Sequence, residues 1–188
     1  MIEREVIQAG TILQEGGIIL YPTDTIWGIG CDASRQDSVR NIYQIKQRAD
    51  FKSMLVLVDG IDMLVRYIER LPQQALEIVE KANKPTTIIY PGARDLAENL
   101  LAPDGSIGIR ITSDPFCRKL IASFGKPIVS TSANISGAAS PGTFSQIDSS
   151  ILEQVDYVVD WRREETTPAA PSAILKLEKD GSITTIRP

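Results

Sequence analysis

Apolar and polar positions recur with two different periods along the chain, and their interleaving predicts an α/β fold. Over residues 3–15 the apolar side chains Val6, Ala9 and Leu13 repeat at helical spacing, and a Gly-Gly pair follows, which is typical of an amphipathic helix that ends at glycine. Short apolar runs bounded by polar residues predict strands instead. We expect strands at residues 18–21, 54–58, 86–90, 106–112, 126–130, 156–160, 172–177 and 182–188.

Further segments carry helical patterns and start signals. Ser34 followed by Asp37 resembles a capping box, and the helix after it is expected to run on into the sequence IKQR. Asp114 before Pro115 predicts a cap and a first helical residue. Together with the helix that ends in IKQR, we expect helices at residues 61–70, 73–82, 115–124 and 145–154.

Composition restricts the class of protein. The chain has 188 residues, of which 43% are hydrophobic and 23% charged, and this fits one globular domain over residues 1–188. Its apolar runs are far shorter than the roughly 18 residues of a membrane span. Its start lacks the order of a signal peptide. We therefore expect a cytoplasmic protein without a membrane partner.

Histidine, cysteine and net charge limit the chemistry. The chain contains no histidine, which excludes Ser-His and Cys-His catalysis and His-ligated metal sites. Cys31 and Cys117 lie far apart and form no CxxC motif, so we interpret both as packing residues. The net charge of −4 argues against broad electrostatic binding of nucleic acid and leaves a local basic patch open.

Polar side chains cluster where predicted strands end. YPTDTIWG (21–28) follows the first strand, and its proline prevents that strand from continuing. Thr23, Asp24 and Thr25 within it are either hydroxyl caps of a turn or one wall of a pocket. GKPIVSTSANISG (125–137) likewise sets an apolar run directly before three hydroxyls and one amide.

Cations follow a predicted helix and interrupt a predicted strand. Lys46, Arg48 and Lys52 gather where the helix ends, and they either favour its macrodipole in solvent or meet a phosphate or carboxylate. Arg110 lies among isoleucines in IGIRIT, so it needs an anionic ligand or an acidic neighbour as partner. The sequence leaves both alternatives open.

Together these pieces resemble the YrdC/Sua5 family of threonylcarbamoyl-AMP synthases. The matching segments follow the family's order over nearly the whole chain: GGIILYPTDTIWGIG, IKQR, SIGIRITSDP, GKPIVSTSANISG, PSAI and TIRP. The family's Lys-x-Arg and Ser-x-Asn pairs are present as Lys46, Arg48, Ser132 and Asn134. A related branch lacks the asparagine, so Asn134 favours the synthases. The resemblance implies a three-layer YrdC-like α/β fold with a twisted mixed sheet and a concave ligand cleft, similar to the single-domain form without the C-terminal Sua5 domain.

The resemblance also implies a reaction. L-Threonine and bicarbonate would give N-carboxy-threonine, whose carboxylate attacks the α-phosphate of ATP, so that threonylcarbamoyl-AMP forms and pyrophosphate leaves. Mg²⁺ would arrive with the ATP phosphates, and no protein metal site is expected. The product serves N6-threonylcarbamoyladenosine formation in tRNA, with the tRNA threonylcarbamoyl transferase complex as recipient and weak tRNA binding as a further expectation.

Roles for individual residues follow from the same resemblance. The implied catalytic set is Lys46, Arg48, Ser132 and Asn134, with Lys46 on the bicarbonate-derived carboxylate. The implied ATP site consists of Arg48, Lys52, Ser106, Ser132, Asn134, Ser140 and Arg187. The implied L-threonine site consists of Thr23, Thr25, Arg110, Ser130 and Ser172, where Arg110 takes the carboxylate and Asp24 shapes the wall.

The chain departs from the family pattern in several places. No proline follows Arg48, and Leu57 stands where many members carry a histidine. The sequence ANKP (82–85) replaces a turn rich in tryptophan, proline and glycine, and the loop 160–172 lacks the usual glycine pair. These differences bear on one threonine contact and on closure of the loop over ATP.

Two other functions stay open. One is an RNA-binding or ribosome-maturation module of the same fold, although the chain is acidic and shows no row of aromatic and basic residues. The other is a related carbamoyl-nucleotide enzyme that acts on a different amine.

Overall fold

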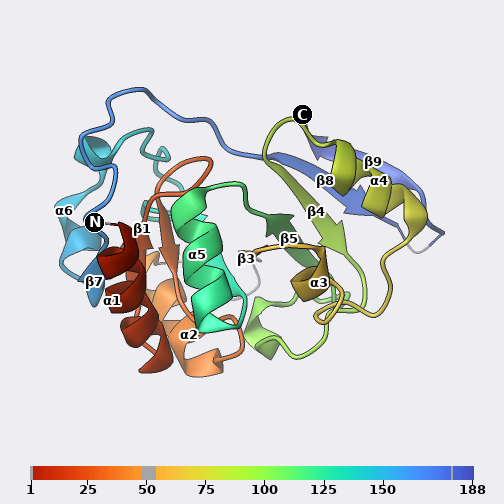
Figure 1. Cartoon of the computed structure of the whole chain (residues 1–188), viewed down its shortest axis with the longest axis horizontal. Coiled ribbons are helices and arrows are strands. Elements are labelled where there is room, and N and C mark those ends of the chain that lie inside the picture. The colour runs from red at the N-terminus through yellow and green to blue at the C-terminus, as the bar shows by residue number, and fades with distance from the viewer. Residues whose placement is uncertain (1, 48–53, 179) are drawn as a thin grey trace.

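A twisted mixed sheet of nine strands runs through the computed structural model, which describes residues 2–47, 54–178 and 180–188 (Figure 1). The strand order is β7-β1-β2-β6-β3-β5-β4-β8-β9. Neighbours pair in parallel for β1 with β7, β3 with β5 and β4 with β8, and antiparallel elsewhere. The α/β class expected from the sequence is confirmed. The strands are β1 (Ile19–Tyr21), β2 (Gly28–Gly30), β3 (Leu55–Val58), β4 (Thr86–Tyr90), β5 (Ile107–Ile111), β6 (Ile128–Ser132), β7 (Tyr157–Val158), β8 (Ala173–Leu177) and β9 (Ile183–Arg187).

Helices connect these strands and cover part of the sheet. The longest helix, α1 (Ile2–Gln14), packs beside α5 (Pro115–Phe124), and the two lie next to each other in Figure 1. The other helices are α2 (Gln36–Ile45), α3 (Ile61–Leu64), α4 (Gln73–Lys81), α6 (Ser149–Leu152) and the short 3₁₀ helices η1 (Glu98–Leu100) and η2 (Phe144–Gln146).

The start of α5 agrees with its sequence signals. Asp114 is the N-cap, and its Oδ1 accepts a hydrogen bond of 2.9 Å from the backbone N–H of Cys117. Pro115 occupies the first turn, where its missing N–H costs nothing. Gly125 ends the helix with a left-handed φ of 77°, which glycine adopts without strain. The predicted bounds of 115–124 are therefore confirmed.

The predicted capping box of α2 is wrong. Ser34 donates its hydroxyl to Asp32 Oδ1 at 2.6 Å, and the N-cap position falls on Arg35, which makes no side-chain cap. Asp37 instead pairs with Arg35 and accepts a hydrogen bond from the next backbone N–H, that of Ser38. The local Asx geometry of Asp32 competes successfully for the Ser34 hydroxyl.

Two predicted helices are shorter or broken. The helix expected at 61–70 ends at Leu64, because the backbone then turns so that Ile68 forms a β-bridge with Ala93. The helix expected at 145–154 is divided into η2 and α6 by Asp148, whose side chain caps the second piece. In both cases distant or capping hydrogen bonds outweigh the helical pattern.

The sequence did not predict β2, because its residues Gly28 and Gly30 are poor strand formers. The structure gives a reason for the second glycine. A Cβ at position 30 would collide with the carbonyl of Val129 and lie 2.7 Å from the ring of Tyr21. Close backbone approach between β2 and β6 therefore requires glycine at this position.

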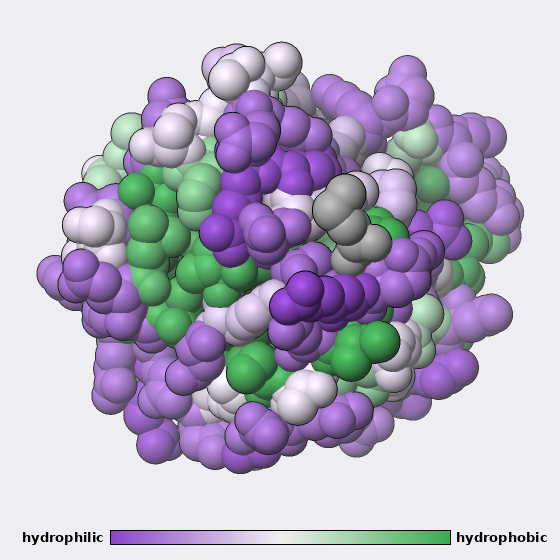
Figure 2. All heavy atoms as spheres, turned by 60° about the vertical axis from the view of Figure 1, so that its left-hand side comes forward, coloured by the Kyte–Doolittle hydropathy of each residue, from purple (hydrophilic) through white to green (hydrophobic). Residues whose placement is uncertain are grey.

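The core holds both cysteines, as expected. Cys31 and Cys117 are fully buried, and burial raises the pKa of each thiol. Hydrophilic side chains cover most of the face in Figure 2, with apolar residues gathered in smaller patches between them. Among the described helices, none is both long and apolar enough to span a membrane.

We predict that Gly30→Ala lowers the free energy of unfolding by about 1–3 kcal/mol, because the added methyl overpacks the β2–β6 contact. Gly60→Ala is the matched control, since a Cβ there meets no atom within 4 Å. Urea unfolding of both variants measures the difference. Equal stability of the two variants would contradict the steric account of Gly30.

Candidate active site

Two cavities lie on opposite faces of β4 and β5, because alternate side chains of a strand point to opposite sides of a sheet. Thr87, Gly108 and Arg110 line the first, of about 290 Å³, which we call the cleft. Ile88 and Ile109 line the second, of about 490 Å³. The cleft also collects most of the motif residues, namely Thr25, Ser130, Ser132, Ser140, Ser172 and Arg187.

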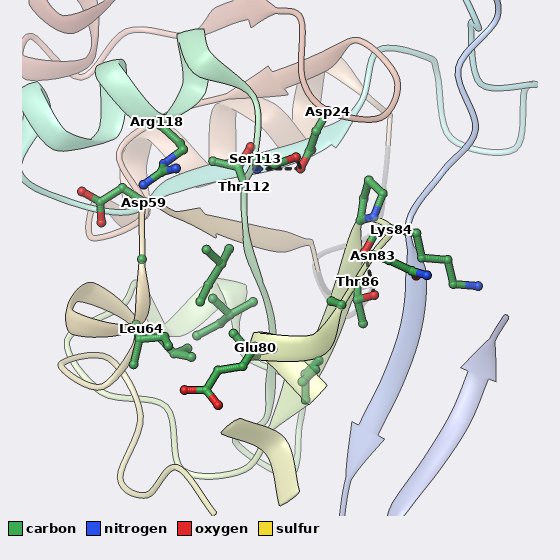
Figure 3. A pocket seen from close by; sticks show the side chains of 18 of the residues that line it. Asp24, Asp59, Leu64, Glu80, Asn83, Lys84, Thr86, Thr112, Ser113 and Arg118 are labelled. Atoms are coloured by element: carbon green, nitrogen blue, oxygen red, sulfur yellow. Dashed lines mark hydrogen bonds between the residues drawn. The ribbon is translucent and has the colours of Figure 1, made fainter. Parts of the chain in front are cut away.

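The second cavity is larger, but its polar groups do not converge. Figure 3 shows charged side chains spread around its rim, with Asp59 and Arg118 at one side and Glu80 at another. Its floor consists of isoleucines and a tyrosine of the sheet. Convergent polar groups mark a ligand site better than volume does, so we place the candidate active site in the cleft.

Arg110 is the buried charge of the cleft. Its side chain is 2% exposed, and its Nη2 lies 3.0 Å from Oδ1 of Asp24, itself 6% exposed. Nη2 also donates to the hydroxyl of Thr25 at 3.2 Å. Asp24 is therefore the acidic neighbour that the sequence left open as a partner for Arg110. Arg110 Nε and Asp24 Oδ1 are both buried and make no aligned hydrogen bond within the described part of the chain, so the pair is held mainly by charge.

The segment after β1 forms a compact hydroxyl wall. The hydroxyls of Thr23 and Thr25 lie 2.9 Å apart, and Thr23 also accepts from the backbone N–H of Thr25 at 3.0 Å. Asp24 Oδ2 accepts a hydrogen bond of 3.1 Å from the backbone N–H of Ser113 (Figure 3). The hydroxyls of Thr23 and Thr25 therefore stabilise a turn, and Thr25 also lines the cleft.

The structure brings the Lys-x-Arg and Ser-x-Asn motifs together through Lys46. Its ammonium, on a side chain 2% exposed, donates to the carbonyls of Ser132 and of Asn134, the second at 2.7 Å, and approaches Asn134 Oδ1 at 3.5 Å. The amide of Asn134 donates to the carbonyl of Ala138 at 2.7 Å. Lys46 therefore fixes the exit of β6, beside which Ser132 and Ser140 line the cleft. Arg48 and Lys52 lie outside the described residues.

The C-terminal strands close the cleft from the other side. The hydroxyl of Ser172 lies 2.8 Å from that of Thr87, and Arg187 donates its Nε to the Ser172 carbonyl at 2.8 Å. A residue near the end of the chain is therefore brought to the same cleft as Thr25 and Ser130.

Ser106 and Leu57 are placed differently from the other predicted positions. The hydroxyl and backbone N–H of Ser106 both donate to Asp104, and four residues along a strand separate Ser106 from Arg110 by roughly 13 Å. Leu57 pairs in register with Arg110 and is fully buried. It supplies apolar packing beside the arginine where a histidine would offer a polar group.

Several residues that line the cleft were not among the predicted site residues, and Gly108, Thr87 and Trp27 are three of them. Gly108 leaves space in its floor, and a glycine within an apolar strand pattern is a sequence signal for such close approach. Thr87 and Trp27 had no distinguishing signal, because β-branched and aromatic residues are ordinary in strands. The Trp27 ring packs against that of Phe144 in a tilted arrangement, with centroids 4.8 Å apart and an interplanar angle of 52°.

Groups that could bind a metal are sparse in this structure. Within residues 2–47, 54–178 and 180–188 there is no group of three His, Cys, Asp or Glu side chains positioned to hold an ion. The arrangement is that of a polar cleft around one buried guanidinium, suited to an anionic ligand with hydrogen-bonding groups.

This fold and site define an α/β protein with a ligand cleft on one face of a mixed sheet. The family model Sua5_yciO_yrdC, described as "Telomere recombination", matches residues 11–188. The chain belongs to this Sua5/YciO/YrdC family.

Relatives and solved structures agree with this assignment. A threonylcarbamoyl-AMP synthase of Pseudoalteromonas translucida is 33% identical over 164 residues, which cover 85% of this chain and 88% of the relative. E. coli YciO has a TM-score of 0.83 at 26% identity and covers 98% of this chain and 88% of its own. P. abyssi Sua5 complexed with L-threonine has a TM-score of 0.87 at 21% identity and covers all of this chain. This chain spans only 54% of that Sua5 chain.

We predict that Gly108→Val blocks the cleft and weakens binding of ATP or L-threonine by at least about tenfold, or about 1.4 kcal/mol. A Cβ at position 108 would lie 3.3 Å from Thr87 Cγ2, and the methyls beyond it would enter the cleft. Thr86→Val is the matched control, because Thr86 faces the second cavity. Isothermal titration calorimetry measures the dissociation constants of ATP and of L-threonine for each variant. Weaker binding in the control alone would move the site to the second cavity.

Proposed function

We propose that the chain is a threonylcarbamoyl-AMP synthase. It combines L-threonine, bicarbonate and ATP into L-threonylcarbamoyl-AMP, with release of pyrophosphate and water. The observation that carries the proposal is the buried Arg110 guanidinium in a hydroxyl-lined cleft. The names of the matched relatives and the L-threonine complex of P. abyssi Sua5 support it.

L-Threonine binds at the Arg110 end of the cleft. The guanidinium of Arg110, which lines the cleft, takes the substrate carboxylate, as burial strengthens such a charge-assisted hydrogen bond. Hydroxyls of Thr25, Ser130 and Ser172 line the same cleft and supply further hydrogen bonds. Thr23 acts indirectly, by holding the hydroxyl of Thr25.

ATP binds toward the exit of β6 and the end of β9. Ser132, Ser140 and Arg187 line this part of the cleft, and Asn134 holds the turn between the two serines. Arg48 and Lys52 are assigned to the phosphates from the sequence pattern. Mg²⁺ accompanies the ATP phosphates, since this ion usually keeps several waters and binds through substrate oxygens.

The chemical step requires positioning and charge stabilisation rather than a general base. The nucleophile is the carboxylate of N-carboxy-threonine, which is already ionised near neutral pH. It bonds to the α-phosphorus of ATP, the bond to the bridging oxygen breaks, and pyrophosphate carries away the electron pair. Cations around the phosphates stabilise the developing charge. A chain without histidine is compatible with this chemistry.

The product places the protein in tRNA modification. Threonylcarbamoyl-AMP supplies the group for N6-threonylcarbamoyladenosine, with the tRNA threonylcarbamoyl transferase complex as recipient and the cytoplasm as location. The second candidate, an RNA-binding module, is disfavoured by the net charge of −4.

We predict that pyrophosphate release depends on L-threonine and falls to background without an amino acid. L-Serine should be about 10- to 100-fold poorer in kcat/KM, because one missing methyl is worth about 1–3 kcal/mol. Arg48→Ala should abolish release. A coupled assay of pyrophosphate release measures the dependence on L-threonine, the activity with L-serine and the activity of Arg48→Ala. ATP turnover indifferent to the amino acid, combined with RNA binding that weakens steeply with salt, would instead support the RNA-binding module.

We predict that Arg110→Lys raises the KM for L-threonine about 10-fold or more and leaves the KM for ATP nearly unchanged. Lysine keeps the charge beside Asp24 but loses the planar guanidinium fork, which can donate to Asp24, Thr25 and a carboxylate in different directions. The exposed ion pair of Arg35 with Asp37 offers the control variant Arg35→Lys. A KM increase shared equally between both substrates would contradict the assignment of Arg110 to L-threonine.

A further inference from the structure

Residues 160–172, which we call the strap, join β7 to β8 without regular secondary structure. In Figure 1 the strap runs along the top of the molecule, from the side of β7 and α6 to the side of β8 and β9. It ends at Ser172, inside the cleft. Its path is therefore fixed at the cleft end, and the contacts of its first half decide how it lies over the hydroxyl wall.

Arg162 anchors the first half of the strap. Its Nη1 lies 2.7 Å from Asp114 Oδ2 and donates to the backbone carbonyl of Thr23 at 3.1 Å. Its Nε donates to Glu165 Oε1 at 2.7 Å within the strap. Asp114 is only 3% exposed on its side chain and uses its other oxygen to cap α5. One guanidinium therefore joins the strap, the cap of α5 and the hydroxyl wall.

The backbone of Arg162 indicates that these contacts hold it in place. Its φ is 61°, in the left-handed region that residues other than glycine seldom adopt. Such conformations persist where surrounding contacts determine them, and they occur often at ligand sites. The side chain is 29% exposed, so the ion pairs are partly shielded from water.

A third cavity, of about 450 Å³, lies between the strap and the hydroxyl wall. Arg162 and Pro168 line it from the strap, and Thr23 lines it from the wall. It shares Thr25 and Trp27 with the cleft. The strap is thus an outer wall of the space that adjoins the cleft at Thr25.

A short chain of hydrogen bonds leads from Arg162 to Arg110. The guanidinium of Arg162 holds the Thr23 carbonyl, the Thr23 hydroxyl meets that of Thr25, and Thr25 accepts from Arg110 Nη2. Each link is at most 3.2 Å long. A shift of the strap at Arg162 would therefore move the groups that line the Arg110 end of the cleft.

We propose that Arg162 is a positioning residue for the amino-acid substrate. It holds the strap against the Thr23–Thr25 segment and thereby fixes Thr25 and the guanidinium of Arg110 where the substrate carboxylate binds. This role rests on the proposed function, because it assigns the Arg110 end of the cleft to L-threonine. ATP, at the other end of the cleft, depends on it much less.

The test uses Arg162→Gly, because glycine accepts the φ of 61° without strain while the side-chain contacts are lost. The KM for L-threonine should rise about 10-fold while the KM for ATP changes less than about twofold. Arg162→Lys should recover part of the loss, since an ammonium can still pair with Asp114. Arg35→Gly, which removes an exposed arginine paired with Asp37, is the control.

A second readout does not depend on activity. Cleavage by a glutamate-specific protease at Glu164 and Glu165 reports the release of the strap, and it should be faster in Arg162→Gly than in wild type. Equal KM changes for both substrates, or an unchanged KM for L-threonine, would overturn the positioning role. If the wild-type protein showed no threonine-dependent pyrophosphate release, the proposed function would be refuted, and with it the role of Arg162 toward the substrate. The protease result would still decide whether Arg162 anchors the strap.

Discussion

The ion pair between Arg110 and Asp24 is the interaction on which the site depends. A guanidinium 2% exposed in the centre of a sheet is tolerable only with a charged partner, and removing one partner of such a pair typically costs about 3–5 kcal/mol. The partner comes from the segment after β1, which Pro22 prevents from continuing as a strand. The pair therefore fixes a loop from the start of the chain against β5, and the hydroxyls of Thr23 and Thr25 take their places around it.

The same carboxylate connects both faces of the sheet. Asp24 Oδ1 meets Arg110 on the side of the cleft, whereas Oδ2 accepts from Ser113 at the rim of the second cavity. Ser113 directly precedes Asp114, which caps α5 and pairs with Arg162. The cleft, the start of α5 and the strap therefore share one continuous set of charged and polar contacts. A change at any of these places alters how firmly Arg110 is held.

Local patterns predicted the elements well where one physical signal dominated. Thr86–Tyr90 and Pro115–Phe124 were predicted with their observed bounds, because a continuous run of β-branched residues in the first and a cap with proline in the second left no competing structure. Predictions failed where distant contacts decided, as for β2, whose Gly30 is explained only by the approach of the Val129 carbonyl and the Tyr21 ring. Seven of the predicted site residues line the cleft, but no local signal could show that the Lys46 ammonium binds the exit of β6 or that Arg162 reaches Thr23.

The distribution of charges around the cleft explains how a chain with a net negative charge can offer a binding site for anions. Arg110 is neutralised by Asp24, so it contributes directional donors more than net charge. Lys46 donates to carbonyl and amide oxygens, which carry no net charge, and Arg187 donates to the Ser172 carbonyl and has no carboxylate partner in the described part of the chain. Arg187 therefore adds a positive charge toward the end of β9, and directional hydrogen bonding lies at the Arg110 end. A triphosphate gains most from the first and an amino-acid carboxylate from the second, which is the order of substrates along the cleft that the proposed reaction requires.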